Sequence, residues 1–206
     1  MNYKCLTVLT TSLKSDGKTT VMFAMLRKAL KANKKVLFIT SKKDYNLYSI
    51  VKNSPFFSEV ESLKYINVIY CENVDTIHNL INNDSLSGEY EEIFIDDIDN
   101  FLLMKDNELR SNVHRLLTKR ARKINEIVRN IKSNNNTEKV ILSFTLYPES
   151  NDDLRLESLL KEYKDYLSND YFMYCSADKT NEKVHVAEII NNFLNEVSYK
   201  DLKKYL

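Results

Sequence analysis

The chain has 206 residues and a mass of 24.2 kDa, enough for one domain with a sizeable core. Hydrophobic residues make up 43% and charged residues 29% at a net charge of +1, a balance that excludes an intrinsically disordered chain. No apolar run approaches the roughly 20 residues of a membrane-spanning helix, and the three widely spaced cysteines argue against a disulfide framework or zinc site. We therefore expect a single cytoplasmic domain over residues 1–206, with no signal peptide and no membrane contact.

The first two predicted elements enclose a candidate phosphate-binding loop. A β-branched apolar run at 5–11 predicts a strand, and apolar residues spaced by three and four predict an amphipathic helix at 18–32. Between them, TTSLKSDGKTT matches the pattern G-x-x-x-x-G-K-[ST], except that Ser12 replaces the first glycine. The chain has only two glycines, where average usage would give roughly fourteen, so Gly17 marks a position where the backbone needs one.

The residue types of this loop suit the chemistry of a nucleotide phosphate. Backbone N–H groups and a helix N-terminus surround the β-phosphate, a lysine reaches the β- and γ-oxygens, and a hydroxyl holds Mg²⁺. We assign Lys18 to the phosphates and Thr19 to Mg²⁺. The predicted nucleotide-binding residues are Ser12, Lys14, Ser15, Asp16, Gly17, Lys18, Thr19 and Thr20. The alternative is an ordinary turn that caps the helix.

The predicted elements in the middle of the chain end with a strand whose last two residues are acidic. They are a strand at 34–40, a helix-like stretch at 44–53, a strand at 66–71, a helix at 73–83, a loop around Gly88 and a strand at 91–97. In P-loop proteins a carboxylate at the end of a neighbouring strand holds Mg²⁺. Asp96 is the predicted metal ligand, and Asp97 is predicted to orient the attacking water. Alternatively, these acids cap the next helix. Their occurrence together with the phosphate loop favours a catalytic pair.

A long helix predicted at 107–132 carries an excess of positive charge. Nine basic and three acidic residues give the stretch from Lys105 to Lys132 a charge of about +6, whereas the whole chain has +1. Such asymmetry suits a nucleic-acid backbone, and a solvated helix face is the alternative. The predicted nucleic-acid contacts are Arg115, Lys119, Arg120, Arg122 and Lys123.

The remaining elements complete an alternating pattern. They are a loop at 133–138, a strand at 139–145, a helix at 154–167, a strand at 170–176, a strand or helix start at 183–190, and a helix over 191–206. Strands alternating with helices imply an α/β fold, with a mostly parallel sheet covered by helices on both faces. Ligands bind such sheets at the carboxyl ends of the strands.

Several segments together resemble a known family. KKVLFITSKKD, EEIFIDDIDNFLLM, NEIVRNIKSNNNTEKVILSFTLYP and DYFMYCS followed by KVHVAEII occur in the order of the RecA-like ATPase core of DnaB-type replicative helicases. The resemblance covers most of the chain in layout, and individual residues only at the phosphate loop and the acidic strand. It implies a three-layer RecA-like P-loop fold with ATP and Mg²⁺ as cofactors. It also implies a helicase-like or loader-like role in DNA replication or recombination, as a homo-oligomer or with a replication-protein partner.

Three positions tied to hydrolysis depart from that family. Lys42 stands where the family has a water-activating Glu, and Phe144 stands where it has a polar Gln. The expected arginine finger is absent, because Asn191 and Asn192 follow AEII. These departures predict nucleotide binding with weakened hydrolysis. Two alternatives are a catalytically inactive interaction module that docks on a helicase and a small-molecule kinase of the P-loop class.

A second resemblance assigns two residues differently. FIDDIDNFLLMKDNEL followed by KVILSFTLYP is also similar to AAA+ ATPases of the initiator and helicase-loader type. That resemblance gives Asp97 the catalytic place and Ser143 the sensor place. It also implies a helical lid with an arginine sensor after the last strand, and no clear lid follows. We therefore prefer the RecA-like resemblance.

Overall fold

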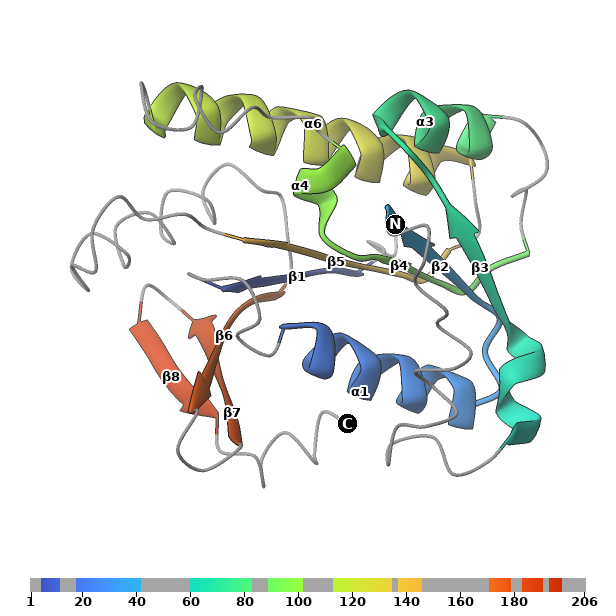
Figure 1. The fold of residues 1–206 in the computed structure, drawn as a ribbon, viewed down its shortest axis with the longest axis horizontal. Helices are drawn as coiled ribbons and strands as arrows, with labels where there is room; N and C mark the ends of the chain where they lie inside the picture. The colour runs from blue at the N-terminus through green and yellow to red at the C-terminus, as the bar shows by residue number, and fades with distance from the viewer. Residues whose placement is uncertain are drawn as a thin grey trace.

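In the computed structural model, the strands of the described residues form one sheet of eight (Figure 1). The described residues are 5–11, 18–41, 60–82, 89–101, 113–134, 137–145, 171–178, 183–190 and 193–197. The strands are β1 (Cys5–Thr11), β2 (Val36–Thr40), β3 (Ile66–Tyr70), β4 (Glu92–Ile95), β5 (Lys139–Thr145), β6 (Tyr171–Asp178), β7 (Lys183–Ile190) and β8 (Phe193–Val197). The helices are α1 (Lys18–Lys31), α3 (Val74–Asn82), α4 (Ile98–Phe101) and α6 (Val113–Asn134), with a 3₁₀ helix η1 (Val60–Tyr65).

The order of the strands is β3-β2-β4-β5-β1-β6-β7-β8. The first six strands in this order pair in parallel, whereas β7 runs antiparallel to both β6 and β8. Only β5 separates β1, which leads into the predicted phosphate loop, from β4, which leads into the acids. The order therefore brings the ends of both motifs to one edge of the sheet.

Helices cover both faces of the sheet, which confirms the predicted α/β fold (Figure 1). On one face, α1 packs against Val36 and Phe38 of β2; on the other, α3, α4 and α6 pack against Leu37 and Ile39. Such strands bury both faces, because successive side chains point to opposite sides of a strand. Phe38 is the centre of an aromatic group on the α1 face, with ring centroids 6.2 Å from Phe23 and 6.4 Å from Phe94.

One stripe of α6 explains why this helix lies on the sheet. Ala121, Ile124, Ile127, Val128 and Ile131 are buried in the core of that face. Their spacing by three and four residues places them on one side of the helix. Among the described residues, no helix is both long and apolar enough to span a bilayer.

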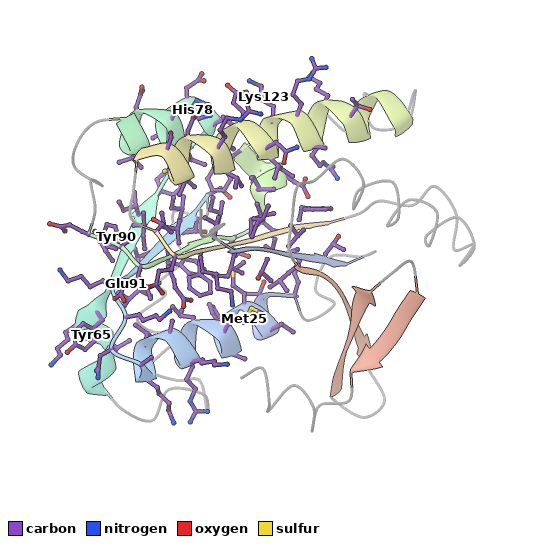
Figure 2. All side chains as sticks on the ribbon, turned by 180° about the vertical axis from the view of Figure 1, so that it is seen from behind. Met25, Tyr65, His78, Tyr90, Glu91 and Lys123 are labelled. Carbon is purple, nitrogen blue, oxygen red and sulfur yellow. The ribbon has the colours of Figure 1, made fainter. Side chains whose placement is uncertain are left out.

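Ion pairs hold the amino-terminal edge of the sheet, opposite the acids. Lys34 Nζ lies 2.8 Å from Glu92 Oε1 and 2.9 Å from Glu138 Oε2. Burial lowers the pKa of Lys34, but hydrogen bonds to the two carboxylates outweigh it and raise the pKa overall. Figure 2 shows Glu91 and Tyr90 at this same edge. This cluster joins the starts of β2, β4 and β5.

Some predicted elements need correction. The helix predicted over 191–206 is wrong at 193–197, because Phe193–Val197 pairs with β7 as a strand. Residues 183–190, left open between strand and helix, form β7. The strand predicted at 91–97 ends at Ile95. The predicted helices at 44–53 and 154–167 lie outside the described residues.

Candidate functional site

Lys18, from the described end of the phosphate-loop motif, meets the acids that follow β4 at the carboxyl edge of the sheet. Lys18 is the first residue of α1 and is buried at 4% exposure. Its Nζ lies 2.5 Å from Oδ1 of Asp97, which follows β4. Lys18 and Asp97 are far apart in the sequence, so this ion pair arises only from the fold. It is the central contact of the candidate site.

Asp97 has an unusual backbone conformation. Its φ of 51° lies in the left-handed region that favours glycine. Its N–H donates to Ser143 Oγ at 2.9 Å, and its carbonyl accepts from the Asn100 N–H at 2.9 Å. Aspartate is among the non-glycine residues that visit this region most readily. The conformation ends β4 and leads directly into α4.

Asp96 is more deeply buried than Asp97. It is 1% exposed, and its N–H donates to the carbonyl of Ile39 at 3.0 Å. The Ser143 hydroxyl donates to Asp96 Oδ1 at 3.1 Å. The same hydroxyl oxygen accepts from Asp97, so Ser143 holds both acids. From the sequence, Ser143 was singled out only through the second resemblance.

Strand alternation and register place three buried polar residues on the α1 face. Ile39 of β2 lies beside Ile95 of β4, so the next residues, Thr40 and Asp96, are neighbours. Ile95 lies beside Leu142 of β5, so Asp96 is likewise next to Ser143. All three side chains point away from the α6 core, because Ile39, Ile95 and Leu142 point into it. Two hydroxyls thus flank one carboxylate on the side where α1 begins.

This set of oxygens fits Mg²⁺ only if other ligands complete it. Carboxylate and hydroxyl oxygens are ligands that a hard cation accepts. No group of three or more His, Cys, Asp or Glu side chains suited to a metal occurs in the part of the chain that the structure describes. Mg²⁺ usually takes one or two carboxylates and completes its shell with water and substrate phosphates. Asp96 and Thr19, which is half-buried in the first turn of α1, fit that pattern of few protein ligands.

Phe144 does not face this site. It is buried in the α6 core, and the guanidinium carbon of Arg120 lies 5.7 Å from its ring centroid. Adjacent residues of a strand point to opposite faces, so Ser143 faces the acids and Phe144 faces α6. The polar position of β5 next to the acids is therefore Ser143, one residue before the position that the first resemblance matched.

Several predicted residues lie outside the described part of the chain. They are Ser12, Lys14, Ser15, Asp16 and Gly17 of the loop, and Lys42, Asn191 and Asn192 among the departures. Thr20 belongs to the first turn of α1, but its side chain is not among those described. The residues that the structure brings together are Lys18, Asp96 and Asp97, with Ser143 added.

The predicted nucleic-acid residues divide between two sides of α6. Lys119, Arg122 and Lys123 are exposed, as is Arg129. Figure 2 shows Lys123 on the outer side of the helix, with its Nζ 3.1 Å from Glu126. An open groove of about 540 Å³ on α6 is lined by Thr118, Ala121, Arg122, Asn125, Glu126 and Arg129. Arg115 lies in α6, and its side chain is not among those described.

The prediction that Arg120 belongs to an exposed nucleic-acid surface is wrong. Arg120 is 4% exposed, and its Nε lies 3.0 Å from Asp99 Oδ1. A side chain held in the interior by an ion pair is not part of the exposed basic surface. The helical period explains this difference, because position 120 falls beside the buried stripe, whereas 119, 122 and 123 do not.

One buried thiol lies at the end of the strand next to β2. Cys71 follows β3, and its N–H donates to the carbonyl of Thr40 at 3.0 Å. Burial raises the pKa of this thiol to about 11. The thiol therefore stays protonated at neutral pH, which excludes Cys71 as an activated nucleophile.

No protein-family model matches this chain, and no curated protein sequence matches it significantly. The residues of the candidate site must therefore carry the functional conclusion by themselves.

Proposed function

We propose that this chain is a RecA-like P-loop protein that binds ATP with Mg²⁺ and hydrolyses it slowly. The contact that carries the proposal is the 2.5 Å ion pair between Lys18 Nζ and Asp97 Oδ1. It joins the lysine of the phosphate-loop motif to the acidic strand end, at the carboxyl edge where α/β sheets bind ligands. A turn that merely capped α1 would not require its lysine to be buried against a carboxylate.

Each residue has a role that follows from its position. The first turn of α1 presents N–H groups that have no acceptor within the helix, and such groups favour phosphate. Lys18 would exchange the carboxylate of Asp97 for β- and γ-phosphate oxygens. Asp96 and Thr19 would hold Mg²⁺, which neutralises charge on the phosphates. Once released from Lys18, Asp97 would accept a hydrogen bond from the attacking water, and Ser143 would keep both acids in place.

The strands beyond β6 support the RecA-like alternative over the AAA+ alternative. The AAA+ resemblance implies a helical lid after the last parallel strand. In the described residues, 183–190 and 193–197 instead form the antiparallel strands β7 and β8. Slow hydrolysis is proposed because Lys42 replaces the water-activating Glu of the RecA-like family.

The exposed basic side of α6 supports a role on DNA. Four basic side chains, Lys119, Arg122, Lys123 and Arg129, are exposed along this helix, and phosphate contacts of this kind position a protein on nucleic acid without reading its sequence. We propose a helicase-like or loader-like factor of DNA replication or recombination, working as a homo-oligomer or with a replication-protein partner.

A second candidate function is an interaction module without nucleotide chemistry. The same ion pair favours it, because Asp97 already neutralises the ammonium that should attract phosphate. The two functions make opposite predictions about nucleotide affinity. A vestigial site keeps the ion pair and the fold, whereas an active site exchanges the pair for phosphate.

Nucleotide binding by calorimetry tests the proposal. With Mg²⁺, the wild-type chain should bind ATP or ADP, and Lys18→Ala should lower the affinity about 10- to 100-fold, since hydrogen bonds to charged groups contribute about 1.5–3 kcal/mol. The matched control is Lys31→Ala, an exposed lysine at the other end of α1, which should leave the affinity unchanged.

Two outcomes would contradict the proposal. A wild-type chain that binds neither ATP nor ADP at millimolar concentration is an interaction module. If Lys18→Ala binds as tightly as wild type, the phosphate-loop assignment is wrong. A stoichiometric complex with a measurable, Mg²⁺-dependent release of phosphate would support the ATPase.

A further inference from the structure

We propose that Arg120 is a positioning residue that holds the two segments of the candidate site together. The inference rests on the proposed nucleotide-binding function and assigns a residue that the sequence had placed on the nucleic-acid surface. Arg120 directly follows the exposed Lys119, yet it is buried between α6 and the sheet. The contacts of its guanidinium indicate its role.

Arg120 contacts both parts of the chain that form the site. Its Nε lies 3.0 Å from Asp99 Oδ1, two residues after Asp97. Its guanidinium carbon lies 5.7 Å from the ring centroid of Phe144, the residue after Ser143. A single side chain therefore touches the segment that carries the acids and the strand that carries their hydroxyl partner.

The segment that Arg120 holds has little stability of its own. Asp97 has a φ of 51°, and α4, which follows it, is a single turn of four residues. One helical turn does not persist alone, because forming its first hydrogen bond fixes several residues. Packing must therefore hold this segment, and Ile98 and Phe101 supply its apolar part. The ion pair between Arg120 and Asp99 supplies the polar part.

An arginine is needed here rather than any cation. A buried guanidinium is costly unless it is paired, and an apolar side chain would fill the same place at lower cost. The guanidinium of Arg120 forms an ion pair with Asp99 and lies near the ring of Phe144. A planar guanidinium can combine these two contacts, whereas a compact lysine ammonium does not combine them in the same way. The arrangement thus fixes the direction in which Asp96 and Asp97 leave β4.

This direction matters most for Mg²⁺. Residues that orient metal ligands typically change metal affinity or activity by about 10- to 100-fold when they are replaced. The phosphate contacts of Lys18 and α1 come from another part of the chain. Replacement of Arg120 should therefore weaken the Mg²⁺-dependent part of nucleotide binding and leave the Mg²⁺-independent part in place.

The test compares ADP affinity in Mg²⁺ with ADP affinity in EDTA, using the full-length chain. In Arg120→Gln we expect the enhancement by Mg²⁺ to fall about tenfold or more, with the affinity in EDTA within about threefold of wild type. The enhancement by Mg²⁺ in Arg120→Lys should lie between that of wild type and that of Arg120→Gln. The control, Lys31→Gln, removes an exposed cation at the far end of α1 and should keep the wild-type enhancement.

Asp99→Asn provides a second route if Arg120→Gln does not fold. It keeps the shape of the side chain and the arginine, removes the charge of the pair, and should reduce the enhancement in the same direction. A folded Arg120→Gln or Asp99→Asn that keeps the full enhancement overturns the inference. An equal loss of affinity in Mg²⁺ and EDTA also overturns it, because that result indicates a general loss of structure.

The wild-type measurement separates the two proposals. If wild type binds ADP with an enhancement by Mg²⁺ and the variants keep it, only the role of Arg120 is wrong. If wild type binds no ADP in either buffer, the proposed function is wrong, and the positioning role is wrong with it.

Discussion

Asp97 combines two interactions and an unusual backbone conformation that no other described residue of the site shares. Its carboxylate pairs with Lys18, its N–H donates to Ser143, and its backbone has a φ of 51°. The pair lies in a mostly desolvated place, since the side chains of Lys18 and Asp97 are 5% and 20% exposed. Removing one partner of such a pair leaves the other charge buried without compensation.

A double-mutant cycle on this pair should therefore show strong coupling. We expect Asp97→Asn to lower the free energy of unfolding by about 3 kcal/mol. Adding Lys18→Met to it should restore part of the loss, with an interaction energy of about 1–3 kcal/mol. Urea denaturation measures all four proteins. Glu72→Gln, on an exposed residue, is the control and should change stability by less than about 0.5 kcal/mol. Additive single effects would show that the pair does not form in solution.

At the scale of elements, α6 presents different residues to two environments. Its buried stripe packs on the sheet, and Arg120 lies beside that stripe. Its exposed side carries Lys119, Arg122 and Lys123. A helix with this division can bind a polyanion without changing its packing, because the exposed charges do not take part in the core. The basic stretch of the sequence therefore consists of two sets of residues with different surroundings.

Neutralising the exposed set tests the contact with DNA. The triple variant Lys119→Gln, Arg122→Gln, Lys123→Gln should bind a labelled duplex more weakly. The slope of log affinity against log salt should become shallower by about 0.9 for each DNA phosphate that the variant no longer neutralises. Fluorescence anisotropy over a salt series measures both quantities.

The control for this prediction removes the same charge elsewhere. Lys28 and Lys31 are exposed in the last turn of α1, and Lys35 is exposed directly before β2. Their triple replacement by Gln should reproduce wild-type affinity and slope. If both triple variants weaken binding equally, the effect is one of net charge, and α6 is not the contact surface. Wild-type affinity in the α6 variant leads to the same conclusion.

At the scale of the whole molecule, the described residues form two cores that share one sheet. Phe38 belongs to the core under α1, and Ile127 of α6 belongs to the core on the opposite face. Both cores contain residues of β1, β2, β4 and β5, so neither can form without the sheet. The site at the carboxyl edge depends on both cores, because Lys18 comes from one layer and Arg120 from the other.

Cavities made in the two cores should weaken the same cooperative transition. We expect Phe38→Ala to cost about 3–5 kcal/mol and Ile127→Ala about 2–5 kcal/mol, from reduced burial and residual cavities. The double variant should be additive within about 0.5 kcal/mol, because the two side chains lie in different cores on opposite faces of the sheet. Guanidinium denaturation followed by two spectroscopic probes measures this. Two separate transitions in either single variant would show that the layers unfold independently.

Much of this fold and part of the site were predictable from local patterns. Continuous apolar runs located β1, β4 and β5, and period-3.6 hydrophobicity located α1, each to within a few residues, because a fully buried strand and the buried side of a helix leave short local patterns. The motif residues Lys18, Asp96 and Asp97 were found in the same way, through spacing along the chain. The helix predicted over 191–206 failed at 193–197, where pairing with β7 decides the structure.

What the sequence alone determined is therefore the set of elements and the chemical groups at their ends. Tertiary structure decided which groups meet: strand order brought Lys18 to Asp97, and register placed Ser143 against both acids. It also turned Phe144 and Arg120 into the interior, where the sequence had suggested a polar sensor position and a nucleic-acid contact. The physical reason is that a side chain's direction depends on the face of the strand or helix it occupies. That face is chosen by packing between residues far apart in the chain.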